Sequence, residues 1–470
     1  MEKLNEILTK IDDLVWGLPL IILIMATGIL LTIRLRGIQV RHLWKALKYM
    51  VKNEEGGEGE VTSFGALCTA LSATIGTGNI VGVATAIGIL AGGPGALFWM
   101  WIAAFFGMAT KYAEGFLAIK YRNIDENGNV LGGPFYYIEK GMGLKWKWLA
   151  KLFAFFGACV GLFGIGTFTQ VNGIATAVQS FFDPNKANTV SLFGNEYSIA
   201  IVITAFVLTI CVGLVLIGGI KRIAKVSEIV VPFMAILYVL AALVLIFTNI
   251  KLLPSALKEI VYGAFGIRPI AGGAFASIAI SMQKGVARGI FSNEAGLGSA
   301  PIASAAAKTK DTVRQGLVTM TGTFIDTIIV CTMTGISIIM MGSWANEKLE
   351  GVQVTTDAFK KGLHFIGSDI PAFILMLCLV FFAFTTILGW NYYGEKCLEY
   401  LSNRNKTAVK VYKWLYILAV FIGPYMTVSA VWMIADIFNG LMAIPNIIAL
   451  VALSGVVAKE TKEYFSKKNK

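Results

Sequence analysis

Histidine and charged side chains are scarce in this 470-residue chain. Only His42 and His364 are present, and Asp, Glu, Lys and Arg together make up 14% of the residues, against about 25% in a typical soluble domain. Two histidines far apart in the sequence argue against a His-based metal site. The lack of a His/Asp/Glu constellation also argues against a membrane enzyme.

Paired cysteines and nucleotide-binding motifs are also missing. The six cysteines have no C-x-x-C spacing, so neither a disulfide framework nor a zinc site is indicated. No Walker A pattern occurs, which argues against ATP-driven transport. A channel would more often carry repeated filter motifs, and none is seen.

What the chain has in excess is apolar sequence. Hydrophobic residues make up 56% of the chain, glycine contributes 50 residues, and the mean hydropathy is +0.71. The net charge of +12 does not indicate nucleic-acid binding, because the basic residues sit in short segments between apolar runs. The sequence therefore predicts an all-α polytopic membrane protein embedded in the lipid bilayer.

The apolar runs predict eleven transmembrane helices. The first is too long for the apolar part of a signal peptide and has no A-x-A-like site after it, so we expect it to remain. The predicted spans are 14–35, 64–90, 94–119, 149–182, 198–218, 226–248, 270–290, 313–342, 370–399, 411–426 and 428–457. With the N-terminus outside, 31 of the 40 Lys and Arg residues fall on the inside. The positive-inside rule therefore predicts an outer N-terminus and a cytoplasmic C-terminus in the cell membrane.

The second predicted span is interrupted at its centre. Residues 74–79 read Thr-Ile-Gly-Thr-Gly-Asn, a run that poorly supports a continuous helix in lipid. Such breaks are tolerated where they line a cavity, and they leave backbone groups available to a ligand. The alternative is a kinked helix that packs through its small residues.

After the first helix the spans divide into two halves of five. The leading span of the second half, 270–290, carries Gly272-Gly273, Ser277, Ser281 and Gln283 in an apolar frame. Paired interrupted helices in two oppositely oriented halves indicate the site of a secondary transporter. We expect an N-terminal helix and linker at 1–63 and a first five-helix repeat at 64–248. An extracellular connection at 249–269 would lead to the second repeat at 270–457, and a basic tail would follow at 458–470.

Residues 92–107, GGPGALFWMWIAAFFG, resemble the signature of the alanine/glycine:cation symporter family. The segments 72–84 and 291–303 resemble that family too, and the resemblance covers nearly the whole chain. It implies sodium-coupled uptake of alanine or glycine. It also implies a five-plus-five inverted repeat like that of the bacterial leucine transporter.

For such a substrate, the interrupted helix offers groups to both charged ends. We expect the N–H groups of Thr77 and Gly78 to point at the substrate carboxylate, with Gly76 allowing close approach. The carbonyl of Thr74 is a candidate for the ammonium group. The side chain of Asn79 is a candidate for either substrate or ion.

Two further groups of side chains are candidates for the pocket. Gln170, beside Phe168, lies mid-span, and its alternative is an interhelical hydrogen bond. The resemblance to the leucine-transporter architecture favours Gln170, because a polar residue of the third core helix faces the substrate there. In the seventh span the candidates are Phe275, Ser277, Ile278 and Met282, and plain packing is the alternative.

The resemblance also implies a sodium site. An adjacent hydroxyl pair on the eighth core helix completes such a site in the leucine-transporter architecture. Carried over by position, this implicates Thr385 and Thr386 with the carbonyls of Ser72, Ile75 and Phe382. Five neutral oxygens suit a hard monovalent cation. The alternative is that the two hydroxyls bond back to their own helix.

Acidic residues within the spans are candidates for gating. Asp326 and Asp436 are the deepest, and an intramembrane carboxylate is a functional hypothesis by default. We expect Asp326 either to gate or to be paired in the bundle. Glu114 and Lys111 are expected to form an interfacial pair.

The segment 284–310 is rich in Ala, Gly and Ser. We expect it to fold against the inner mouth as a gate, with Arg288 or Glu294 in a salt bridge. A short amphipathic interfacial helix is the alternative.

Together these features predict a sodium-coupled symporter for small neutral amino acids that acts as a monomer. It would need sodium as coupling ion, no organic cofactor and no nucleic acid. A sodium-independent exchanger or a proton-coupled transporter are the alternatives.

Overall fold

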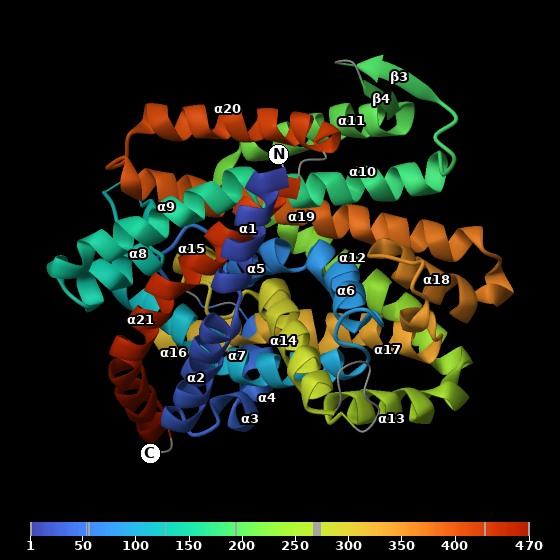
Figure 1. Ribbon diagram of the computed structural model, residues 1–470. Helices are drawn as coiled ribbons and strands as arrows, with labels where there is room; N and C mark the ends of the chain where they lie inside the picture. Colours follow the sequence, from blue (N-terminus) through green and yellow to red (C-terminus); the bar gives the residue numbers. More distant parts are fainter. Residues whose placement is uncertain are drawn as a thin grey trace.

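The computed structural model describes residues 2–52, 54, 57–126, 128–192, 195–266, 274–426 and 429–468. Most of this part is helical, and Figure 1 shows the helices gathered in one bundle. Its α-helices are α1 Glu2–Val15, α2 Leu18–Arg34, α3 Ile38–Arg41, α4 Leu43–Val51, α5 Ser63–Thr74, α6 Val83–Ile87, α7 Gly95–Tyr121, α8 Pro134–Tyr136, α9 Lys147–Phe163, α10 Phe168–Phe182, α11 Ile199–Leu216, α12 Gly219–Thr248, α13 Leu253–Ala264, α14 Ala274–Asn293, α15 Ala300–Ala305, α16 Thr312–Thr323, α17 Thr332–Met340, α18 Val352–Gly362, α19 Asp369–Leu401, α20 Lys406–Ile422 and α21 Ser429–Lys468.

Shorter elements connect these helices. The π-helical turns are η1 Gly78–Gly82, η2 Tyr137–Gly141 and η5 Phe324–Cys331, and the 3₁₀ turns are η3 Leu144–Trp146, η4 Ile250–Leu252, η6 Ser343–Ala345, η7 His364–Ile366 and η8 Gly423–Tyr425. Two small antiparallel hairpins pair β1 Asn123–Ile124 with β2 Val130–Leu131, and β3 Thr189–Leu192 with β4 Asn195–Ser198.

The predicted membrane architecture is confirmed. The described residues contain nine helices long and apolar enough to cross a membrane, or ten if one bent pair counts as a span. The predicted span 270–290 corresponds to α14, which is not among them and carries Lys284 and Arg288. The division of the chain into two repeats stays a prediction.

The first interrupted helix is confirmed. α5 ends at Thr74, and the chain resumes in η1 and α6 after a bend of 52°. At its start, the hydroxyl of Thr62 caps α5 by accepting from the N–H of Gly65 at 2.8 Å. The Gly and Thr residues therefore do interrupt the span at the predicted position.

A second interruption follows α14, at a position that the sequence did not indicate. α14 runs without a break through Ser277, Ser281 and Gln283, and it ends at Asn293. The turn that follows has positive φ at Glu294 (56°), Gly296 (91°) and Gly298 (82°) before α15 begins. Glycine adopts this conformation readily, so the two glycines of this turn set the break. Gly272-Gly273 lies outside the described residues.

The break between α14 and α15 also corrects the expectation for 284–310. Residues 284–293 belong to α14, and residues 292–307 are buried in the bundle. This segment is therefore neither a loop at a membrane surface nor an interfacial helix over most of its length.

α7 passes through the centre of the bundle beside α14, α16 and α2 (Figure 1). Small residues allow these helices to approach closely, as membrane helices often require. A Cβ placed on Gly107 would lie 2.9 Å from the Cβ of Ala295, and one on Gly316 would lie 2.8 Å from the carbonyl oxygen of Tyr112. α7 thus holds both interrupted segments against a common core.

Candidate functional site

The backbone of the first break is bonded by side chains from elsewhere in the fold. The N–H of Gly76 donates to Asn79 Oδ1 at 2.9 Å, and the N–H of Thr77 donates to Gln170 Oε1 at 3.1 Å. In a continuous helix these two N–H groups would donate to the carbonyls of Ser72 and Ala73. The break therefore frees carbonyl oxygens at the end of α5.

Gln170 joins α10 to the break. Its side chain is buried, and its Nε2 donates to the carbonyl of Ile165 at 3.0 Å, which fixes the orientation of the amide. One turn later, a Cβ on Gly173 would lie 2.7 Å from Thr77 Cγ2. Gln170 thus forms the interhelical hydrogen bond that was the alternative to ligand binding, and its partner is the predicted ligand-binding backbone itself.

The hydroxyl of Thr386 reaches the first break, whereas that of Thr385 does not. Thr386 Oγ1 lies 3.2 Å from the carbonyl oxygen of Ile75 and 2.9 Å from that of Phe382. Thr385 Oγ1 donates to its own helix, at 3.1 Å to Phe381 and 3.0 Å to Phe382. The predicted sodium ligands Ile75, Phe382 and Thr386 are therefore brought together.

Ser72 lies on the side of α5 that faces α19. Its hydroxyl donates to the carbonyl of Thr69 at 2.8 Å, and a Cβ on Gly389 would lie 2.9 Å from Ser72 Oγ. α5 and α19 therefore touch at the level of the break. Because of this contact, the carbonyl of Ser72 stays a candidate ligand of the predicted sodium site.

The part of α14 that faces the first break is its C-terminal end. A Cβ on Gly78 would lie 3.4 Å from Phe291 Cδ1 and 3.5 Å from the Cα of Ser292. Ile278 precedes Phe291 by 13 residues, roughly 20 Å along a helix at 1.5 Å per residue. Ser277 is buried, and Ile278 and Met282 are half-buried on that distant part of α14.

The remaining predicted pocket residues are dispersed. The side chain of Phe275 lies outside the described residues. Phe168 is buried, and a Cβ on Gly423 would lie 3.2 Å from its Cδ1. Thr74 and Thr77 at the break are also buried.

Glu114 holds the second break, which corrects the expected interfacial pair. Its Oε1 accepts from the N–H groups of Gly296 and Gly298 at 3.2 Å each and from Asn446 Nδ2 at 2.8 Å. Glu114 and Lys111 are both buried. The carboxylate thus satisfies backbone donors that the left-handed turn leaves without helical partners.

Glu294 does not pair with Arg288. Its carboxylate accepts from the hydroxyl of Ser299 and from Trp390 Nε1, the latter at 3.0 Å. Arg288 lies with its guanidinium 5.3 Å from the centre of the Phe291 ring and lines a small polar cavity with Asp12, Asp13, Asp436 and others. Neither Arg288 nor Glu294 forms an ion pair within 4.0 Å among the described residues, so the predicted salt bridge of one or the other is absent from this conformation, and their gating role stays a prediction.

Asp326 links the two breaks. Its Oδ1 accepts from Asn79 Nδ2 at 2.7 Å, and its Oδ2 accepts from Ser292 Oγ at 2.9 Å and from Thr327 Oγ1 at 2.7 Å. Asn79 belongs to η1, Ser292 ends α14, and Asp326 lies in η5. The sequence analysis missed Ser292 and Thr327, and the adjacent hydroxyl in Asp326-Thr327 was the available signal.

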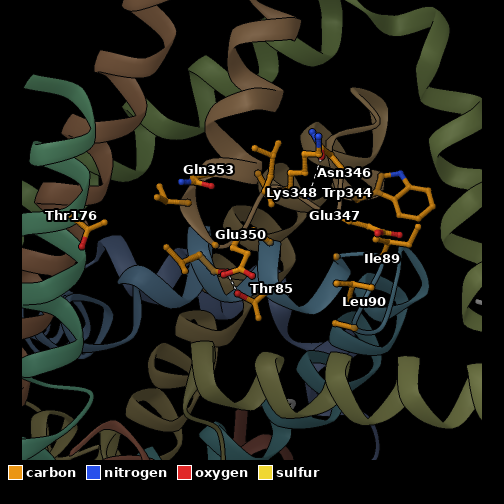
Figure 2. A pocket seen from close by; sticks show the side chains of 18 of the residues that line it. Thr85, Ile89, Leu90, Thr176, Trp344, Asn346, Glu347, Lys348, Glu350 and Gln353 are labelled. Atoms are coloured by element: carbon orange, nitrogen blue, oxygen red, sulfur yellow. Dashed lines mark hydrogen bonds between the residues drawn. The ribbon is translucent and has the colours of Figure 1, made fainter. Parts of the chain in front are cut away.

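A cavity of about 690 Å³ lies at the end of the bent helix where α6 stops. Figure 2 shows side chains from α6, α10, the segment before α18 and the start of α18 around it, among them Thr85, Thr176, Glu350 and Gln353. Its lining also includes Gly173, which packs on Thr77 of the first break. The cavity therefore leads from this end of the molecule toward the candidate site.

The opposite end is closed by backbone pairing. Val61 and Ala307 form a parallel bridge, in which the N–H of Val61 donates to the carbonyl of Ala306 at 3.1 Å and the N–H of Lys308 donates to the carbonyl of Val61 at 2.7 Å. The guanidinium of Arg122 donates to the carbonyls of Ala305, Ala307, Thr309 and Glu58. Residues before α5 and after α15 are thus held together.

Replacing Arg122 by alanine is expected to loosen this closure. One hydrogen bond from a charged group contributes about 1.5–3 kcal/mol, so losing four should raise the accessibility of residue 307 by roughly tenfold or more. Maleimide labelling of Ala307→Cys, with Cys159 and Cys211 replaced by serine, measures it. Arg222→Ala is the control, because Arg222 reaches one carbonyl, that of Leu214. Equal labelling rates in both variants would contradict the assigned role.

Among the described residues no group of three or more His, Cys, Asp or Glu side chains is placed to hold a metal ion. The converging oxygens at the first break instead comprise one hydroxyl and main-chain carbonyls. Such neutral ligands suit a hard monovalent cation rather than a transition metal.

The whole chain, residues 1–470, matches the model of the sodium:alanine symporter family. It is 54% identical to an uncharacterised transporter of Haemophilus influenzae, over 99% of this chain and 97% of that protein. It is 47% identical to the sodium/alanine symporter AgcS of Methanococcus maripaludis, over 98% and 97% respectively. The crystal structure of MhsT in complex with L-phenylalanine, at 13% identity and a TM-score of 0.48, covers 86% of this chain and 99% of that one.

Proposed function

Because the chain belongs to the sodium:alanine symporter family, we propose that it couples the inward movement of sodium to the uptake of small neutral amino acids such as alanine and glycine. The family consists of transporters, so the chain is a multi-pass membrane transporter and not an enzyme. Its N-terminus would be outside the cell membrane, its C-terminus in the cytoplasm, and the monomer would suffice for transport.

The observation that carries sodium coupling is the position of Thr386. Its hydroxyl meets the carbonyl of Ile75, at 3.2 Å, where α5 ends. A cation bound there would tie α19 to the interrupted helix, with the carbonyls of Ser72 and Phe382 and the hydroxyl of Thr385 as further candidate ligands. Sodium would thus stabilise one arrangement of the break, which is what coupling requires.

The first break supports amino-acid binding. Its N–H groups at Gly76 and Thr77 donate to the side-chain oxygens of Asn79 and Gln170. The oxygens of a substrate carboxylate would take the place of these two side-chain oxygens as acceptors. The carbonyl of Thr74 and the N–H of Gly78 complete the proposed set. Phe168, Phe275, Ser277, Ile278 and Met282 stay candidate pocket residues whose roles depend on movement of α14.

The geometry supports alternating access. The large cavity reaches Gly173 from one end, while Arg122 and the Val61–Ala307 bridge close the other. In the proposed orientation the cavity faces the outside and the closure faces the cytoplasm. The predicted gate at the inner mouth would then be residues 305–309 rather than Arg288 or Glu294.

Thr386→Val is expected to remove sodium dependence while leaving the fold intact. Valine keeps the shape of threonine but cannot offer an oxygen to the cation. We expect uptake of labelled alanine into proteoliposomes under an inward sodium gradient to fall to the level seen with equal potassium. Thr204→Val is the matched control, since the Thr204 hydroxyl bonds only its own helix, at 2.7 Å to the carbonyl of Ala200.

Three outcomes would contradict this proposal or its sodium site. Uptake by the unaltered protein that ignores sodium but needs internal amino acid would indicate exchange. Uptake that follows a proton gradient alone would indicate proton coupling. Normal sodium dependence of uptake in Thr386→Val would show that Thr386 of α19 is not a sodium ligand.

A further inference from the structure

The segment from the end of α2 to the end of α4 carries charge of one sign. Residues 34–52 contain six Lys and Arg residues and no Asp or Glu. Four of these six side chains are exposed and form no ion pair within 4.0 Å among the described residues, namely Arg36, Arg41, Lys48 and Lys52. Such a cluster of unneutralised cations favours binding of an anionic partner.

α4 has one face that no other part of the described chain covers. Ala46 is fully buried, and α4 packs on α16. Trp44 and Val51, in contrast, are 82% and 73% exposed. Because seven residues make about two turns of a helix, these two side chains share one face. The exposed Lys48 lies between them on that face, about one turn from each. The free face of α4, formed by Trp44, Lys48 and Val51, thus combines apolar and cationic side chains.

Another side of α4 is fixed to the C-terminal end of α21. The ring of His42 stacks on that of Phe465 with 3.9 Å between the ring centres, and Lys45 Nζ lies 4.8 Å from the centre of the same Phe465 ring. The hydroxyl oxygens of Tyr49 and Tyr464 are 3.4 Å apart. Figure 1 shows α4 at the end of the bundle where α21 terminates. These contacts hold the free face of α4 in one orientation, directed away from the bundle.

α4 is also joined to the inner closure that Arg122 makes. The guanidinium of Arg314, on α16, donates to the carbonyl of Lys52 and has its Nε 3.8 Å from a carboxylate oxygen of Glu54. Glu54 in turn accepts from the hydroxyl of Thr309, and the carbonyl of Thr309 accepts from Arg122 at 2.6 Å. The position of α4 is therefore linked to the closed arrangement through consecutive polar contacts.

We propose that the free face of α4 binds an anionic phospholipid of the inner leaflet, and that this binding favours the closed inner end of the molecule. The proposal rests on the proposed function in one respect, the orientation that places α4 on the cytoplasmic side. Lys48, with Arg41 just before α4 and Lys52 just after it, would contact the phosphate of the headgroup. Trp44 and Val51 would lie among the acyl chains.

The mixture of side chains is what identifies a lipid as the partner. Helices that lie in the plane of a membrane carry apolar and basic residues in this way, and tryptophan is typical of the membrane–water interface. A soluble phosphate compound would neutralise Lys48 but would leave Trp44 and Val51 in water. An anionic phospholipid satisfies both kinds of side chain at once.

The double variant Lys48→Gln/Lys52→Gln tests the binding. The full-length protein in detergent is titrated with phosphatidylglycerol or with the zwitterionic phosphatidylcholine, and the unfolding temperature is measured. We expect phosphatidylglycerol to stabilise the unaltered protein more. Each Lys or Arg near an anionic surface contributes roughly a fivefold preference. The phosphatidylglycerol concentration for half the rise should therefore increase about 25-fold in the double variant.

Two further variants separate lipid binding from simple charge. Trp44→Ala keeps every charge and should still require more phosphatidylglycerol for half the rise. Lys406→Gln/Lys410→Gln is the matched control, because it removes two exposed cations at the start of α20 that form no ion pair among the described residues. Its titration should match that of the unaltered protein. Glycerol phosphate, the soluble part of the headgroup, should not raise the unfolding temperature.

The effect on the inner end is measured by maleimide labelling of Ala307→Cys, with Cys159 and Cys211 replaced by serine, in lipid nanodiscs that expose both faces. We expect labelling to be several-fold slower in phosphatidylglycerol than in phosphatidylcholine. With Lys48→Gln/Lys52→Gln added, the two lipids should give similar rates, because the lipid no longer holds α4 in place.

Equal stabilisation of the unaltered protein by the two lipids would overturn the proposed lipid site, as would unshifted titrations in Lys48→Gln/Lys52→Gln and Trp44→Ala. Stabilisation by glycerol phosphate as strong as that by phosphatidylglycerol would overturn it too, and would assign the face to a soluble phosphate compound. A labelling rate that ignores phosphatidylglycerol would overturn the link to the closure. None of these readouts involves transport, so failure of the proposed function would be recognised separately, as uptake by the unaltered protein that does not respond to sodium.

Discussion

Alanine at position 76 is expected to abolish amino-acid uptake. A Cβ on Gly76 would lie 2.6 Å from Thr386 Oγ1 and 3.1 Å from Gln170 Oε1. Neither atom can move freely. Thr386 Oγ1 is held by the carbonyls of Ile75 and Phe382, and Gln170 is held at both ends of its amide. One methyl group would therefore disturb the proposed sodium ligand and the partner of Thr77 together.

The size of this effect follows from the packing. Inserting a methyl group into a filled core costs typically about 1–3 kcal/mol. The fold of the whole bundle can withstand a loss of that size, but the geometry of a ligand site cannot. We expect the variant to reach the membrane in near-normal amount and to transport no alanine above background. Uptake in proteoliposomes, normalised to the protein inserted, measures this.

Gly82→Ala provides the matched control. Gly82 ends η1 in the same interrupted helix, and a Cβ there would meet nothing within 4 Å. The two variants change the helix propensity of neighbouring turns alike but differ in what the methyl group touches. Normal uptake by Gly76→Ala, or equal loss in both, would show that the close approach at Gly76 is not what transport requires.

Replacing Glu114 by alanine is expected to lower the stability of the whole transporter. Its carboxylate bonds two N–H groups of the second break and the amide of Asn446, all buried. Each buried donor left without its acceptor costs about 1–3 kcal/mol.

Thermal unfolding in detergent is the measurement for Glu114→Ala, with the yield of membrane-inserted protein as a second readout. Glu114→Gln keeps one acceptor oxygen, so its unfolding temperature should fall between those of the unaltered protein and Glu114→Ala. Glu460→Ala is the control, because Glu460 pairs with Lys120 at 2.6 Å with both side chains partly exposed, a pair worth about 1 kcal/mol or less. Similar losses in Glu114→Ala and Glu460→Ala would refute the role given to Glu114.

The sequence predicted the first break because its cause is local. Gly76, Thr77 and Gly78 in an apolar run are poor helix formers in lipid whatever surrounds them. The break after α14 was not predicted, because its cause is partly remote. Gly296 and Gly298 adopt positive φ in a turn that Glu114 stabilises from α7, nearly 200 residues away in the chain. Pairings at that separation cannot be read from one sequence.

The same limit applies to individual side chains of the candidate site. Thr385 and Thr386 are adjacent, yet successive residues of a helix point about 100° apart, so only one can face the break. The sequence could not say which, and the contact of Thr386 with Ile75 distinguishes them. The family resemblance indicated which helix carries the sodium ligand, whereas only the structure shows which face of that helix is turned toward the break.

Arg122 closes its end of the molecule by contacting main-chain oxygens only. Those oxygens are present whichever side chains occupy positions 58, 305, 307 and 309. Natural variation at these four positions should therefore be permissive as far as this closure is concerned. Lysine could not substitute for Arg122, because an ammonium group presents a single point charge where the planar guanidinium reaches several acceptors at once. Evolutionary constraint on the closure thus falls on one residue and on the path of the chain around it.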